Sequence, residues 1–185
     1  MTAAAAPRPY LAADRRKALI VEAVVALAAR REPAAITTAA IAREMGLTQG
    51  AVFRHFASKE EIWAAAVDWT AETLLARLDA AAQAAPSPLA ALEAMFLAHA
   101  GFAAEHPGVP RLIFAELQKP EATPAREAAR GLLESYAARV AARIEAAKAA
   151  GQASAGVETR AAALLFVGAV QGLVMQSLLT GDPAR

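Results

Sequence analysis

Apolar residues recur along this chain of 185 residues at spacings of three and four, and Val and Ile do not alternate with polar residues as they would in strands. Long stretches rich in Ala, Leu, Arg and Glu favour helix. Proline and glycine interrupt the pattern at several points and mark helix ends. The sequence therefore predicts an all-α protein. The expected helices cover residues 14–30, 38–45, 49–56, 58–84, 89–105, 110–118, 123–150 and 157–180.

Residues 36–63 contain two short predicted helices joined by a tight turn. Thr37 or Thr38 can cap the first helix by accepting a backbone N–H that lacks a partner, and Thr48 can cap the second. Gly46 lies between them, where the chain must leave the helix with a positive φ that glycine adopts without steric cost. This combination is typical of a helix-turn-helix. The side chains expected where the two helices cross are small or apolar: Ile41, Ala42, Met45, Leu47 and Val52.

The second short helix is expected to present outward the residue types that contact DNA. Gln49 can pair bidentately with adenine, and Gly50 lets the helix approach the base edges. The Phe53 ring can contact a thymine methyl group, and the start of the helix, at Thr48 and Gln49, favours a phosphate. With Val52 and Phe56 turned inward, the outward residues are Thr48, Gln49, Gly50, Phe53, Arg54 and His55.

Basic side chains near the same helix are candidates for phosphate contacts. Arg54 and His55 can donate hydrogen bonds to phosphate oxygens, and so can Lys59 at the start of the following helix. Ser58 begins a Ser-Lys-Glu-Glu capping-box pattern that marks this helix start. The net charge is only +1, but residues 1–63 hold nine Lys/Arg against six Asp/Glu, so the positive excess lies in this part of the chain.

Residues 14–63 resemble the DNA-binding domain of the TetR family of bacterial transcriptional regulators. The resemblance rests on the opening helix DRRKALIVEAVVALAAR, on the segment TTAAIAREMGLTQGAVFRHFASKEEIW, and on an aromatic-x-x-Phe pattern, Phe53 to Phe56, followed by Lys59-Glu60. The family's first aromatic is often tyrosine, and Phe53 lacks the hydroxyl that would reach a phosphate. By position, the resemblance implies DNA contacts from Thr38, Thr48, Gln49, Gly50, Phe53, His55 and Lys59.

The resemblance also implies how the chain is organised. Family members usually carry a ligand pocket among the helices between the linking helix and the dimer interface. We therefore expect an unidentified small-molecule effector and most simply a repressor that its ligand releases from the operator. Activation stays open, because the sign depends on where the operator lies relative to the promoter. The expected segments are a flexible arm, 1–13; the helix-turn-helix domain, 14–57; a linking helix, 58–85; and an effector-binding and dimerisation domain, 86–185. The candidate pocket residues are Met95, His99, Phe102, His106, Phe114, Tyr136, Gln171 and Met175.

The last predicted helix carries no charge over residues 161–179, a length that could span a bilayer. Gln171, Gln176 and Ser177 interrupt it and no basic cluster flanks it, so a membrane is not expected as a partner. A helix that is apolar nearly all round needs burial on several sides, which a second copy of the chain would supply. The resemblance implies a homodimer through residues 123–150 and 157–180, and its two recognition helices, ~34 Å apart, would read a pseudo-palindromic operator in double-stranded DNA.

Other classes of function find less support in the sequence. No nucleophile–base pair, acidic dyad or glycine-rich phosphate loop is visible, so we expect no enzyme and no catalytic residue. His99 and His106 lie seven residues apart without a third ligand nearby, so neither a metal nor a cofactor is expected. A module that binds a protein partner, with DNA binding incidental, stays open. Cysteine is absent and the first eleven residues lack the apolar core of a signal peptide, which favours a cytoplasmic location, at the nucleoid.

Overall fold

A computed structural model describes residues 9–180 of the chain. These residues form helices and no strand, which confirms the predicted all-α class. Residues 1–8 of the arm expected at residues 1–13 lie outside the described residues. The remaining residues of that segment are helical, because α1 begins at Pro9. The elements in order are α1 (Pro9–Ala28), the 3-10 helix η1 (Pro33–Ala35), α2 (Thr38–Glu44), α3 (Gln49–Phe53), α4 (Lys59–Ala84), α5 (Pro88–Glu105), α6 (Gly108–Leu117), α7 (Pro124–Ala149) and α8 (Thr159–Thr180).

Most of these helices start at a residue that the sequence marks clearly. Before each start, a Ser or Thr side chain accepts a hydrogen bond from the backbone N–H three residues further on. Gly46 and Gly151 adopt positive φ angles of 65° and 69° just after α2 and α7, which lets the chain leave those helices without a β-carbon clash. The capping residues are Thr37, Thr48, Ser58, Ser87 and Thr123.

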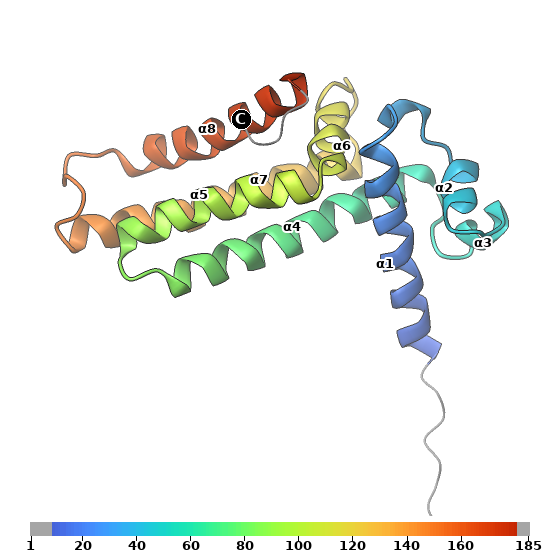
Figure 1. The fold of residues 1–185 in the computed structure, drawn as a ribbon, viewed down its shortest axis with the longest axis horizontal. Coiled ribbons are helices and arrows are strands. Elements are labelled where there is room, and N and C mark those ends of the chain that lie inside the picture. The colour runs from blue at the N-terminus through green and yellow to red at the C-terminus, as the bar shows by residue number, and fades with distance from the viewer. Residues whose placement is uncertain (1–8, 181–185) are drawn as a thin grey trace, which may run out of the picture.

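The long helices α4, α5, α7 and α8 run along one another and form an elongated body, and α1, α2 and α3 lie at one end of it (Figure 1). α4 joins the two parts, because it packs on α1 as well as on α5 and α7. Two ion pairs connect helices of the body: Arg77 binds both oxygens of Glu105 at 2.5 and 2.7 Å, and the Arg139 Nε lies 3.1 Å from both oxygens of Asp79.

Two local features differ from the prediction. α3 ends at Phe53 rather than at Phe56, because Phe56 must turn into the core, where it is buried, and Ser58 must be extended to cap α4. The 3-10 turn η1 was not expected. It forms where Pro33 presets the backbone angle for a turn, and the Ile36 N–H donates to the Pro33 carbonyl at 3.2 Å.

One face of α8 packs on nothing within the described chain. A β-carbon on Gly168 or Gly172 would have no heavy atom within 4 Å, and Leu165 and Leu179 are 75% and 81% exposed. α8 is long and apolar enough to cross a membrane by length and composition, and only 22% of its most apolar window is buried. The same exposure is expected of a helix whose outer face packs on a second copy of the chain.

Candidate nucleic-acid interface and ligand pocket

The turn between α2 and α3 has the geometry that the sequence predicts. The Gly46 N–H donates to the Arg43 carbonyl at 3.1 Å, and the Leu47 N–H donates to the Ala42 carbonyl at 2.8 Å, which closes the end of α2. The Thr48 hydroxyl then accepts the Ala51 N–H at 3.3 Å and starts α3. The inward side chains are Ile41, Ala42 and Val52, which are buried, and Met45 and Leu47, which are half-buried.

The outward face of α3 is largely exposed at the positions that are predicted to contact DNA. Phe53 is 45% exposed although it is aromatic, and a β-carbon on Gly50 would meet nothing within 4 Å. His55 is half-buried and so lies at the margin of this face. The structure thus brings together most of the residues predicted to contact DNA. The exposed residues are Thr48, Gln49, Gly50, Phe53 and Arg54.

A hydrogen bond connects the two short helices across the outward face. The side-chain amide of Gln49, which is exposed, donates to the hydroxyl of the half-buried Thr38 at 2.7 Å. The bond restricts the Gln49 rotamer, and it leaves the amide oxygen and one N–H for a base edge. Both residues are predicted DNA contacts, but the sequence gives no sign that they bind each other.

Lys59 lies differently from the other candidates. Its ammonium donates to the Ala34 carbonyl at 3.3 Å and sits 4.6 Å from the centre of the Trp63 ring. Burial, and then repulsion by Lys119, lowers the pKa of this ammonium from its usual value. In this structure Lys59 therefore joins α4 to η1, and it does not extend from the outward face of α3.

Another cation lies close to the helix-turn-helix and was not among the predicted contacts. Lys17 is exposed on α1, and its ammonium lies 5.6 Å from the centre of the Phe56 ring, a cation–π distance. It follows Arg15 and Arg16, which are also exposed. The run Arg-Arg-Lys in the first helix was the sequence signal that could have identified this basic surface.

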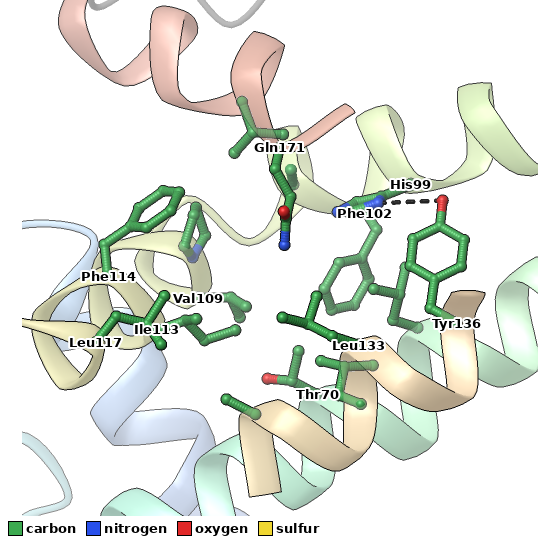
Figure 2. A pocket seen from close by; sticks show the side chains of 16 residues that line it. Thr70, His99, Phe102, Val109, Ile113, Phe114, Leu117, Leu133, Tyr136 and Gln171 are labelled. Carbon is green, nitrogen blue, oxygen red and sulfur yellow. Dashed lines mark hydrogen bonds between the residues drawn. The ribbon is translucent and has the colours of Figure 1, made fainter. Parts of the chain in front are cut away.

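A cavity of about 140 Å³ lies in the body, between α4, α5, α6, α7 and α8 (Figure 2). Five of the eight predicted pocket residues line it: His99, Phe102, Phe114, Tyr136 and Gln171. The other three lie elsewhere. Met95 is buried in the core, Met175 is exposed on α8, and His106 packs its ring 5.3 Å from that of Trp69. The residues that sequence reasoning missed include Thr70, Val109, Ile113, Leu117 and Leu133.

The polar groups of the cavity are few and uncharged. His99 Nδ1 and the Tyr136 hydroxyl form a hydrogen bond of 3.3 Å, drawn dashed in Figure 2. Burial lowers the pKa of His99 to about 4 and raises the pKa of Tyr136, so both side chains are neutral at physiological pH. Among residues 9–180, no three His, Asp or Glu side chains are grouped as metal ligands.

The helix α6 connects this cavity to the DNA-binding helices. Ile113, Phe114 and Leu117 face the cavity, whereas Gly108 touches α1 on another side of the helix. A β-carbon on Gly108 would lie 2.0 Å from the Val25 carbonyl oxygen, so the two backbones are already in direct contact. α6 also packs on η1. A displacement of α6 at the cavity would therefore be transmitted directly to α1 and η1 in the DNA-binding part.

The carboxylate of Glu116 lies near the C-terminal end of α6. It is 1% exposed and accepts hydrogen bonds from the Thr123 hydroxyl, at 2.8 Å, and from the Lys119 ammonium. Because each carboxylate oxygen has a partner, the cost of burying this charge is offset locally. These bonds tie the end of α6 to the start of α7.

The described residues form a helix-turn-helix at one end of a helical body, and the body contains an apolar pocket. This arrangement defines the class: a two-domain helix-turn-helix protein. Residues 20–66 match the family model described as bacterial regulatory proteins, tetR family, and residues 115–185 match the tetracyclin repressor-like C-terminal domain. The two matches together cover more than half of the chain. The chain belongs to the TetR family of bacterial regulatory proteins, which confirms the resemblance found in the sequence.

Individual relatives agree with this assignment. The nucleoid occlusion factor SlmA of Marinomonas sp. (strain MWYL1) is 31% identical over 101 residues, 55% of this chain and 51% of the relative, so the chain spans about half the length of the curated relatives it matches. A TetR-family regulator from Agrobacterium tumefaciens has a TM-score of 0.80 and 23% identity, over 93% of this chain and 92% of that chain. FadR from Bacillus subtilis, solved with stearoyl-CoA, has a TM-score of 0.79 and 16% identity, over 89% and 88%. These two structures share the fold.

Proposed function

We propose that this chain is a sequence-specific, DNA-binding transcriptional regulator. The observation that carries the proposal is the exposed face of α3, where Gln49, Phe53 and Arg54 stand around the open space at Gly50. This face combines a bidentate base reader, an apolar contact for thymine and a phosphate donor, which are the parts of major-groove recognition. Family membership supports the same role. The SlmA relative is a nucleoid occlusion factor, and the proposed location of this chain is the cytoplasm, on the nucleoid.

The working unit in this proposal is a homodimer formed through α7 and α8. The uncovered face of α8 supports it, because Leu165 and Leu179 are among the most exposed large apolar side chains of the described residues. Gly168 and Gly172 recur four residues apart on the same face and would let a partner helix approach closely. A twofold dimer presents two α3 helices about one DNA turn, ~34 Å, apart, and therefore selects a pseudo-palindrome.

The body cavity is the proposed effector site, and the proposed regulation is repression that the ligand relieves. Support comes from α4 and α6, which line the cavity and also contact the DNA-binding helices. A ligand lowers operator affinity only if it binds the DNA-incompetent state more tightly, and a ~100-fold loss needs about 2.7 kcal/mol of coupling. Repression follows where the operator overlaps a promoter.

The test is a selection of bound duplexes from a random DNA pool at near-physiological salt. The expected result is enrichment of a pseudo-palindrome with half-sites about one turn apart. Gln49→Ala, run in parallel as a folded variant, should enrich a site in which one base position per half-site is relaxed. If folded, dimeric protein enriched no sequence, with and without cell extract as a source of ligand, the proposal would be abandoned in favour of a protein-binding module.

A further inference from the structure

The side chains that line the body cavity include no charged group. The lining of sixteen residues contains neither Asp, Glu, Lys nor Arg, and most of it is aliphatic or aromatic. An ionised ligand would have to give up its hydration there without a partner of opposite charge, which is costly. The cavity therefore discriminates against ions before any specific contact is considered.

Four polar side chains remain in the lining, and three of them already have hydrogen-bond partners within the protein. Thr70 donates its hydroxyl to the Ala66 carbonyl of its own helix at 2.8 Å, and His99 and Tyr136 bind each other at 3.3 Å. Burial keeps the His99 imidazole neutral, since it lowers the pKa to about 4. The imidazole consequently supplies no positive charge to attract a carboxylate.

Gln171 is the polar group that lacks a partner. Figure 2 shows its side chain reaching from α8 into the cavity, towards the space between Val109 and Phe102. Its amide makes no hydrogen bond with any other described residue, although it can donate two and accept at its oxygen. A primary amide held at the wall of an apolar cavity is suited to bind one hydroxyl or carbonyl group of a ligand.

We infer that the cavity takes an uncharged, mainly apolar ligand that carries one hydroxyl or carbonyl group, and that Gln171 binds this group. The inference rests on the proposed effector site and specifies its ligand class. The volume of about 140 Å³ matches the ~150 Å³ of an apolar cavity that holds benzene, so a single six-membered ring fits without rearrangement. A larger ligand of the same class requires α6 or α8 to move outward.

The experiment compares three probes that share one ring: toluene, benzyl alcohol and benzoate. Each is titrated into the full-length, 15N-labelled protein at pH 7.4, and the Kd is taken from chemical-shift changes. Toluene and benzyl alcohol should bind, and benzoate should bind at least about 30-fold more weakly than benzyl alcohol because its charge stays unpaired. Gln171→Leu should weaken benzyl alcohol about 3- to 10-fold, the size of one neutral hydrogen bond, and leave toluene unchanged.

The matched control is Gln176→Leu, the same substitution on the exposed side of α8. It should leave both Kd values unchanged. Equal binding of benzoate and benzyl alcohol would overturn the ligand class, and so would the absence of binding by all three probes. Loss of toluene and benzyl alcohol alike in Gln171→Leu, or no change in either, would overturn the role of the amide. Occupancy is measured without DNA, so failure here leaves the DNA-binding proposal standing, and failure of the DNA selection leaves these Kd ratios unaffected.

Discussion

The contact between α6 and α1 at Gly108 allows a sharp test of how the two parts of the molecule are joined. In Gly108→Ala the new β-carbon would lie 2.0 Å from the Val25 carbonyl oxygen and 2.8 Å from the Ala29 nitrogen. Both neighbours are backbone atoms of or beside α1, so no side-chain rotation can relieve the overlap. α6 and α1 must separate by about 1 Å to restore an ordinary contact.

The expected cost follows from this displacement. Overpacking a close contact of this kind destabilises by about 1–3 kcal/mol. The higher helix propensity of alanine opposes it by up to about 1 kcal/mol, and less at a helix start. For a protein of this size each kcal/mol lowers the Tm by about 2–4 °C, so Gly108→Ala should lower the Tm by roughly 3–10 °C.

Gly131→Ala is the matched control, because Gly131 lies within α7 and a β-carbon there would meet nothing within 4 Å. The same chemical change should stabilise that helix by about 0.5–1 kcal/mol. Thermal unfolding of both variants and the wild type, followed by circular dichroism, measures both changes in Tm: the expected decrease for Gly108→Ala and the expected increase for Gly131→Ala. If Gly108→Ala unfolded at or above the wild-type Tm while Gly131→Ala rose as expected, the close approach of α6 to α1 would be refuted.

Further variants test DNA recognition, dimer formation and the effect of the buried His99 on stability separately. Gly50→Ala should keep or raise the Tm, since its β-carbon meets no protein atom, yet weaken operator binding in a mobility-shift assay; unchanged affinity would place the DNA away from α3. Gln49→Ala should cost about 1–3 kcal/mol at one base position, whereas Arg54→Ala should weaken all sequences alike and flatten the salt dependence by about one unit, so identical profiles would contradict these roles. Leu165→Glu should yield monomers in sedimentation experiments, and an intact dimer would exclude α8 as its interface. Burial lowers the pKa of His99 from 6.5 to about 4, so the unfolded chain binds more protons between these values. The free energy of unfolding should therefore fall as the pH drops from 7.5 to 5, by about 2 kcal/mol from this residue, and urea titrations of His99→Phe should lack that part.

The sequence specified the helix boundaries well wherever a local chemical signal marks them. Thr48 and Ser58 cap the helices that they are expected to cap, Thr37 is the one of two candidate threonines that caps α2, and Gly46 adopts the positive φ that the turn requires. These features depend on a few neighbouring atoms, so the residue types suffice to predict them. The end of α3 was missed because tertiary packing, the burial of Phe56, decides where that helix stops.

The pocket could be predicted only in part, for a similar reason. His99, Tyr136 and Gln171 were named from residue type, but only the packing of five helices shows that they share one cavity with residues such as Thr70 and Leu133. The sequence around Gly108 showed a helix break and gave no sign of the backbone contact with α1. Long-range contacts of this kind depend on how helices cross, which no local pattern encodes.

The two sides of α6 have a consequence for the engineering of biosensors. Ile113 and Phe114 shape the cavity, whereas Gly108 contacts the backbone of α1 and Glu116 binds Thr123 at the start of α7. Under the proposed function, mutating the first pair in a reporter strain should change ligand selectivity and leave the contacts between α6 and the rest of the protein intact. Libraries that also vary the second pair would mix changes in what is detected with changes in how detection is transmitted. Restricting diversity to the cavity side keeps the dose–response of each selected variant interpretable.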